Sequence, residues 1–386
     1  MSTPLRLGLF YSALYIGTGV SAPYIAVWFT ARGLSGAQIG LILALPMLAR
    51  AVTGPALAIW ADGFRLRRTP MIWMAGGTVL LYAAMAAPLG FWGWLLVWLA
   101  AGSLISSVAP LTDVVALRRA RIEGFNYGWP RGIGSVAFIF ANVVMGWWVA
   151  RSGPEPVLPW IVLAAAGAAW AAILLPPEPV HGDGVEAAAW RARMAGVGEL
   201  LRDRLFMLTT LSVGLIQSAH AFYYAFSALA WRQQGLPESL TGLLWGFAVA
   251  IEVAFLWFME PWRKRVGPVR MLLLGGVAAV VRWTALAFSP PLWLLFPLQL
   301  LHTFSYAATF IASLQLVERL STPSNASAAQ MINSALSGGV IAGVATIASG
   351  WLFDHVGPWG YLAMSAMAAL GLAGAVLASR SDRVRV

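Results

Sequence analysis

The amino-acid sequence predicts an all-α membrane protein with twelve transmembrane helices in two pseudo-symmetric six-helix bundles. Composition is the first observation: 60% of the 386 residues are hydrophobic and only 10% are charged, whereas soluble domains carry about 25% charged residues. The second is that the apolar residues form runs near the ~20 residues that cross a bilayer as a helix. The third is an internal repeat that divides the chain into two halves.

Twelve apolar runs, separated by charged residues or by Gly and Pro, define the predicted spans. They are 7–30, 37–60, 70–89, 92–116, 129–150, 157–176, 205–231, 239–259, 269–288, 291–317, 328–352 and 358–379. A transmembrane barrel is excluded because its strands show alternating segments about 10 residues long. Met1–Gly8 carries one Arg and no small-residue cleavage site, so we expect the first run to be a helix and not a removed signal peptide.

The longest connection between spans separates six helices from six. We expect an N-terminal bundle over 1–176, a cytoplasmic linker over 177–204 and a C-terminal bundle over 205–386. With the N-terminus in the cytoplasm, nineteen of the 25 Lys and Arg residues fall on the cytoplasmic side, and only Arg32, Arg151 and Arg232 fall on the other. This bias predicts a multi-pass protein of the inner (cytoplasmic) membrane with both termini in the cytoplasm.

The two halves resemble each other in sequence. Leu34–Leu41 parallels Leu236–Leu243 at an offset of 202, and Gly76-Gly77 parallels Gly275-Gly276 at an offset of 199. Gly146–Pro154 parallels Gly350–Pro358 at an offset of 204. A parallel duplication of six helices is one way in which secondary transporters build two bundles around a central site.

Several function classes are excluded by composition. The net charge of +10 lies in short loops, which argues against a nucleic-acid surface. The absence of cysteine excludes disulfides and thiol catalysis, and the four histidines lack HxxxH or HExxH spacing. We therefore expect no enzyme, metal, cofactor or nucleic-acid partner.

Several motifs resemble the major facilitator superfamily. The loop Asp62–Arg68 looks like a degenerate form of the superfamily loop motif, with Ala58 where a Gly is usual. More specific stretches resemble the phenylpropionate-permease-like branch, which is related to nucleoside/proton and lactose-type symporters. These are Pro110–Asp113, Tyr127–Ser135, Ser218–Tyr224 and the series Glu252, Arg282-Trp283 and His302. The resemblance covers essentially the whole chain and implies the superfamily fold and proton-coupled uptake of a small organic solute. We expect a monomer in the lipid bilayer, with a small-molecule substrate and protons as its partners.

Charged side chains inside predicted spans mark the candidate site, because an ionised group at mid-bilayer costs about 2.5–3.5 kcal/mol. Glu252 lies ~12 Å and Arg282 ~19 Å from the cytoplasmic ends of their helices, and His302 reaches ~16 Å from the other side. The resemblance implies that such a carboxylate–Arg–His set handles the proton. Burial favours the neutral carboxyl group and an adjacent Arg favours the charged one. The alternative is a permanent Glu252–Arg282 ion pair that only fixes helix packing.

Four charged residues of the N-terminal half complete the polar candidates. Asp113 and Arg131 lie at matching depth near the cytoplasmic surface, which favours a structural or gating salt bridge over substrate contact. Asp62, in the loop motif, is a further gating candidate. Arg50 lies near mid-depth without an acidic neighbour and suits an anionic substrate group. Pairing of Arg50 with Glu252 across the bundle interface is the alternative.

Aromatic and histidine side chains complete the predicted substrate site. His220, Tyr223 and Tyr224 in the seventh span, with Tyr24 in the first, occur in helices that usually line the cavity in this superfamily. Such a lining suits an aromatic or apolar organic acid, although plain packing explains it equally well. We therefore expect proton-coupled uptake of a small organic acid by alternating access. Proton-antiport drug efflux is the alternative within transport, and a membrane enzyme or non-transporting receptor is the alternative of another class.

Overall fold

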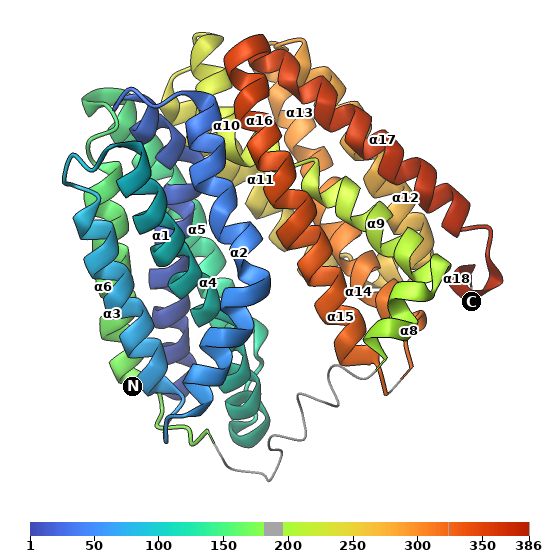
Figure 1. Ribbon diagram of the computed structural model, residues 1–386, viewed down its shortest axis with the longest axis horizontal. Coiled ribbons are helices and arrows are strands. Elements are labelled where there is room, and N and C mark those ends of the chain that lie inside the picture. Colours follow the sequence, from blue (N-terminus) through green and yellow to red (C-terminus); the bar gives the residue numbers. More distant parts are fainter. Residues whose placement is uncertain (181–195, 323, 386) are drawn as a thin grey trace. The chain divides into compact units, whose positions relative to one another are not determined.

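The computed structural model describes residues 1–180, 196–322 and 324–385, nearly all of them helical (Figure 1). The described residues contain no β-structure beyond an isolated antiparallel bridge between Leu66 and Pro179. They form two compact units. Unit 1 comprises 1–184 and 227–246, and unit 2 comprises 185–226 and 247–386. The middle of the predicted linker, 181–195, lies outside the described residues.

Unit 1 is built from the first six long helices. They are α1 (Thr3–Thr30), α2 (Gly36–Asp62), α3 (Arg68–Ala84), α4 (Gly90–Glu123), α5 (Gly128–Ser152) and α6 (Val157–Leu174). Helix α1 packs against α5 and α6, α3 packs against α4 and α6, and α2 packs against α4. Buried side chains of α1, α3, α4 and α6, such as Phe10, Met74, Val108 and Ala171, form a shared core.

Local sequence signals explain where several of these helices begin and end. Ser35 and Gln38 form a capping box in which each side chain bonds the other's backbone N–H, so α2 starts at Gly36. Helix α4 continues past the predicted end at 116 because its Arg-rich last turns suit a helix outside the bilayer. It stops at Gly124, whose φ of 72° requires the left-handed conformation that Gly adopts easily.

The chain after α6 is fastened to unit 1. Pro176-Pro177 ends the helix, and its last carbonyls accept hydrogen bonds from Arg68 and Arg6. Glu178 is 2% exposed and pairs with Arg118 at 2.9 Å and Arg119 at 2.5 Å. The start of the predicted linker is therefore an ordered part of this unit.

Unit 2 is more interrupted than unit 1. Its helical segments are α8 (Val197–Arg202), α9 (Arg204–Ser218), α12 (Glu260–Ala287), α13 (Leu292–His302), η1 (Thr303–Ala308), α14 (Thr309–Arg319), α15 (Ala326–Ser334), η2 (Ala335–Ile341), α16 (Ala342–Val356), η3 (Gly357–Gly360), α17 (Tyr361–Ala378) and α18 (Asp382–Arg385). Helices α10 (Ala221–Gln233) and α11 (Glu238–Phe258) contribute to both units.

The helix neighbours of unit 1 recur in unit 2. Helix α9 packs against α17 and η2, and α12 packs against α17, η1 and α14. These are the seventh, ninth, tenth, eleventh and twelfth predicted spans, and they repeat the contacts of the first, third, fourth, fifth and sixth. The recurrence supports the internal duplication that the sequence indicates.

Three predicted spans contain interruptions that the apolar pattern did not reveal. The seventh breaks at 219–220. Here the hydroxyl of Ser218 donates to the carbonyl of Ser337, and a ring nitrogen of His220 is hydrogen-bonded to the carbonyl of Gln217. Such side-chain bonds compete with the helical ladder. The tenth and eleventh contain the π-helical turns η1 and η2. Within α12, Gly267 has a φ of 76° and precedes Pro268, which explains the predicted start of the ninth span at 269.

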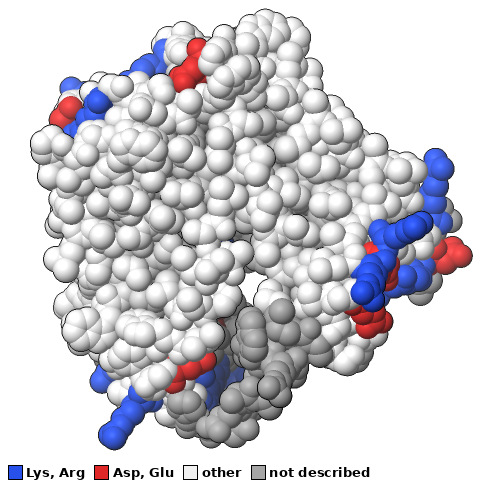
Figure 2. All heavy atoms as spheres, viewed as in Figure 1, with Lys and Arg blue, Asp and Glu red and all other residues white. Residues whose placement is uncertain are grey.

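Nine helices among the described residues are long and apolar enough to cross a membrane. One of them, Ala326–Ala378, covers two predicted spans, and neither α1 nor α3, which has 17 residues, is among the nine. The number of twelve crossings therefore remains a prediction. Figure 2 shows that charged side chains over the N-terminal helices gather at the two ends, with an uncharged wall between them. That distribution fits a membrane-spanning bundle.

Candidate functional site

A cluster of polar side chains surrounds Arg282 inside unit 2. The guanidinium is fully buried, and its Cζ lies 4.4 Å from the ring centroids of both Tyr223 and Trp283. Its Nη2 donates to Oε1 of Gln299 at 2.6 Å, and Nη1 bonds Nδ1 of His302 at 3.0 Å. Aromatic faces and neutral acceptors thus stabilise a charge that is removed from solvent.

His302 lies between Arg282 and Glu252. Because an arginine only donates hydrogen bonds, Nδ1 of His302 accepts, and the proton of the neutral ring is on Nε2. That nitrogen lies 3.7 Å from Oε2 of Glu252, whose side chain is 19% exposed. No direct ion pair joins Glu252 to Arg282 in the described part of the chain. The structure thus brings the three predicted proton-coupling residues together, with the imidazole in the middle.

His220 and the neighbouring aromatic rings complete the cluster. One ring nitrogen of His220 bonds the carbonyl of Gln217 at 2.9 Å, and the other bonds the hydroxyl of Ser305 at 3.1 Å. Its ring stacks on Tyr224 with centroids 5.6 Å apart. Of the predicted substrate residues, His220 is 0% and Tyr223 1% exposed, and Tyr224 is half-buried.

Three members of the cluster were missed by sequence reasoning. Gln299, Ser305 and Tyr306 lie three before, three after and four after His302, and the ring of Tyr306 stacks on His302 with an interplanar angle of 4°. Residues three or four apart share a face of a helix. Their spacing from His302 was the signal that could have identified them.

Asp113 and Arg131 contact each other in unit 1. Nη1 of Arg131 lies 3.1 Å from both carboxylate oxygens of Asp113. The hydroxyls of Tyr11 and Tyr127 also donate to Asp113, at 2.5 and 2.7 Å. The side chains of Arg131 and Asp113 are 47% and 32% exposed. The carboxylate therefore joins α1, α4 and α5 at a partly solvated position.

Arg50 and Asp62 occupy exposed positions on α2. Neither side chain forms an ion pair with another described residue of unit 1. Glu178, which the sequence did not single out, instead forms ion pairs with Arg118 and Arg119 near the end of α4. The one signal for it was an acidic residue among the prolines of Pro176–Pro179.

Tyr24 is fully buried in unit 1. Its hydroxyl lies 3.1 Å from the carbonyl of Asn142 and 3.3 Å from that of Glu238. Gly146 and Gly242 make room for this contact, because a Cβ on either would press against the Tyr24 hydroxyl. In this arrangement the hydroxyl is used to hold helices α1, α5 and α11 together.

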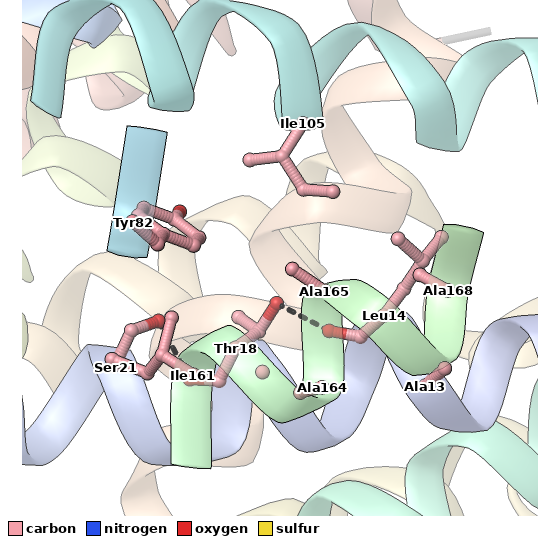
Figure 3. A pocket seen from close by; sticks show the side chains of 11 residues that line it. Ala13, Leu14, Thr18, Ser21, Tyr82, Ile105, Ile161, Ala164, Ala165 and Ala168 are labelled. Carbon is pink, nitrogen blue, oxygen red and sulfur yellow. Dashed lines mark hydrogen bonds between the residues drawn. The ribbon is translucent and has the colours of Figure 1, made fainter. Parts of the chain in front are cut away.

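A separate cavity of about 70 Å³ lies within unit 1 between α1, α3, α4 and α6 (Figure 3). Its walls are mostly Ala, Leu and Ile side chains, with the hydroxyl groups of Thr18, Ser21 and Tyr82. Thr18 and Ser21 donate to backbone carbonyls of their own helix. None of the predicted site residues lines this cavity.

The described part of the chain brings no three His, Asp or Glu side chains close enough to share a metal ion.

Comparison with known proteins identifies the family. The family described as "MFS_1 like family" matches residues 5–362. The chain belongs to this family of major facilitator transporters. The chain is thus a multi-pass membrane transporter of the major facilitator kind, in agreement with its long apolar helices.

Two relatives of this MFS_1-like transporter cover most of its length. It is 27% identical over 360 residues to the "Probable 3-phenylpropionic acid transporter" of Escherichia coli, covering 91% of each chain. It is 28% identical over 351 residues to the "Maltose permease" of Geobacillus stearothermophilus, covering 90% of this chain and 87% of the relative.

Solved structures share the fold of this MFS_1-like chain. The nucleoside transporter NupG has a TM-score of 0.78 at 17% identity, covering 99% of this chain and 100% of NupG. A bacterial homologue of the lysosomal transporter Spinster has a TM-score of 0.72 at 15% identity, covering 98% and 96% of the two chains. These likenesses establish the major facilitator fold predicted from the sequence.

Proposed function

We propose that this transporter takes up a small organic acid together with a proton, and that Glu252 carries the proton. The observation that supports it is the Arg282–His302–Glu252 series, in which a carboxylate of 19% exposure faces an imidazole that is bonded to a buried guanidinium. The relative named as a 3-phenylpropionic acid transporter supports an organic acid as substrate.

Charge balance explains why a proton and an anion would move together. With Glu252 ionised, its negative charge offsets the positive charge of Arg282 within the cluster. Protonation of Glu252 leaves the buried guanidinium without a counter-charge, which is costly in a low-dielectric interior. One substrate carboxylate restores neutrality. The cluster is thus neutral in two states: with no substrate and Glu252 deprotonated, or with one bound anion and Glu252 protonated. In the proposed alternating-access cycle, these two neutral states are the ones that change conformation.

Other predicted residues have supporting roles in this proposal. Arg50, an exposed arginine of α2, is a candidate for binding an anionic substrate, because its planar guanidinium matches a carboxylate. His220, Tyr223 and Tyr224 shape the apolar side of the site around Arg282, and Tyr24 keeps the packing role that its hydroxyl has within unit 1. Asp113 and Arg131 act as a breakable ion-pair latch near the predicted cytoplasmic side, and Asp62, at the end of α2, is the further gating residue of this proposal.

Transport by purified protein in liposomes tests the proton role. Glu252→Gln mimics the protonated carboxyl group, so we expect loss of pH-driven uphill uptake with retention of downhill substrate exchange. Glu260→Gln is the matched control, because Glu260 pairs only with Lys264 on an exposed surface and should retain both activities. Uphill accumulation by the Glu252→Gln variant would remove Glu252 from the proton role and favour the packing alternative.

A substrate panel tests the direction and the substrate class. Labelled 3-phenylpropionate and maltose cover the two solutes named for the curated relatives. We expect pH-driven accumulation of the acid and not of the sugar. Export of unrelated lipophilic cations, with no acid uptake, would instead establish the efflux alternative.

A further inference from the structure

The glycine pairs of the internal repeat are not equivalent in the structure. In α3, a Cβ on Gly76 would meet nothing within 4 Å, and one on Gly77 would approach only the side-chain end of Leu104, at 3.1 Å. In α12, a Cβ on Gly275 would press against Phe304 and Thr309. The first pair has room for a side chain, whereas Gly275 does not. The atoms around position 275 therefore require a glycine there.

Gly275 faces the π-helical turn η1. A Cβ at this position would lie 2.8 Å from the backbone carbonyl oxygen of Phe304 and closer still to Oγ1 of Thr309. The same Thr309 hydroxyl donates to the Phe304 carbonyl at 3.2 Å. A backbone oxygen cannot rotate away as a side-chain end can. An alanine at 275 therefore forces η1 away from α12.

The turn that would be displaced carries the contacts of the candidate site. His302 immediately precedes η1, and Ser305 and Tyr306 lie within it. Arg282 lies seven residues after Gly275, which is two turns along the same face of α12. The hydrogen bond of 3.0 Å from Arg282 to His302 therefore joins the two segments whose spacing Gly275 sets.

The geometry points to Gly275 as a positioning residue of the transport site. Its missing side chain lets η1 lie directly against α12, and this contact holds the imidazole of His302 between Arg282 and Glu252. The role in transport rests on the proposed function, because His302 matters to uptake only if Glu252 carries the proton. The placement of the imidazole itself does not depend on that proposal.

Alanine substitutions at neighbouring glycines provide the test in liposomes. We expect Gly275→Ala to lower pH-driven uptake at least about tenfold and to shift its pH profile, with substrate exchange retained, since displacements near 1 Å can cost about 100-fold. Gly276→Ala is the matched control, because its Cβ would meet side-chain atoms of Leu372 and Ile216 and not η1. Gly76→Ala controls for helix propensity. Equal losses in all three variants would overturn the proposal.

A measurement of the imidazole itself separates this inference from the proposed function. The protein has four histidines, so their ¹⁵N ring signals can be assigned by single substitutions. We expect Gly275→Ala, and not Gly276→Ala, to shift the Nδ1 and Nε2 signals of His302. Shifted signals with unchanged pH-driven uptake would keep the positioning role and overturn the proton role. Unshifted His302 signals would overturn the positioning role.

A second variant covers the case in which Gly275→Ala fails to fold. Thr309→Val keeps the side-chain shape and removes the hydroxyl that bonds the Phe304 carbonyl. It removes a hydrogen bond that holds η1 within its own span, without adding an atom to α12. We expect a smaller shift of the same His302 signals and a smaller loss of pH-driven uptake. No shift in this variant would contradict the dependence of His302 on η1.

Discussion

Arg282 and His302 share a hydrogen bond of 3.0 Å that fixes which nitrogen of the imidazole carries the proton. The guanidinium can only donate, so Nδ1 accepts and the proton resides on Nε2, which faces Glu252 at 3.7 Å. The carboxylate thus meets Arg282 through an intervening ring. The exposure of Glu252 to solvent can therefore change while the guanidinium of Arg282 stays buried.

Replacement of His302 should separate the acceptor role of the ring from its shape. His302→Leu leaves the buried Nη1 of Arg282 without an acceptor, so we expect it to lower the free energy of unfolding by about 1–3 kcal/mol. His302→Asn supplies both a carbonyl acceptor and an N–H₂ donor and should retain more of that stability. Thermal unfolding in detergent measures both. Equal stability of His302→Leu and the unmodified protein would show that the hydrogen bond contributes nothing.

Arg50 should discriminate between anionic and neutral substrates. A lysine keeps the charge and loses the planar fork that binds a carboxylate with two hydrogen bonds. We expect Arg50→Lys to raise the half-saturation concentration for 3-phenylpropionate about tenfold, which corresponds to ~1.4 kcal/mol. Arg65→Lys, in an exposed loop, is the control. An unchanged half-saturation concentration would favour the alternative in which Arg50 serves as an ion-pair partner.

The sequence was sufficient to predict the class of fold, because bilayer burial imposes long apolar runs whatever the details of packing. The start of α2 and the kink within α12 also coincide with local signals, at Ser35 and at Gly267-Pro268. The break at 219–220 and the turn η1 do not. They depend on side-chain bonds to distant partners, such as Ser218 to the carbonyl of Ser337, which no local pattern encodes.

The sequence predicted most residues of the candidate site, but not the contacts that join them. Burial of charge is expensive, so Glu252 and Arg282 stood out within their spans. Depth estimates placed them within reach of each other, but they could not show that His302 fills the space between them. That order depends on η1, whose extra residue changes the helix register at this position.

The contact between Asp113 and Arg131 should affect turnover and not substrate affinity. Asp113→Asn keeps an oxygen acceptor for the hydroxyls of Tyr11 and Tyr127 and removes the charge that holds Arg131. The pair is partly solvated, so its loss should cost about 1 kcal/mol or less. We expect a several-fold change in maximal transport rate at an unchanged half-saturation concentration. A raised half-saturation concentration at an unchanged rate would indicate substrate contact in place of a latch.

Asp203 should make the stability of unit 2 depend on pH at the start of α9. Burial acts to raise the pKa of Asp203, but the Arg383 side chain and the N–H groups of Phe206 and Leu205 outweigh it and hold the pKa below its usual 3.8. Its carboxylate accepts from both N–H groups, at 2.9 and 3.2 Å, and from Arg383 at 2.8 Å.

Because the pKa of Asp203 is lower in the folded state, its contribution is present above pH 3.8 and is lost as the pH falls through the lowered value. We expect Asp203→Ala to cost about 0.5–2 kcal/mol at neutral pH, the usual range for a lost N-cap. Asp203→Asn can still accept hydrogen bonds from the N–H groups, so it should lower the free energy of unfolding by less. The part of that free energy that depends on acid pH should disappear in this variant. Unfolding measured at neutral and at acid pH tests this difference. A deficit of Asp203→Ala that persists unchanged below the lowered pKa would contradict an ionised cap, because a protonated Asp203 has already lost the contacts that the alanine lacks.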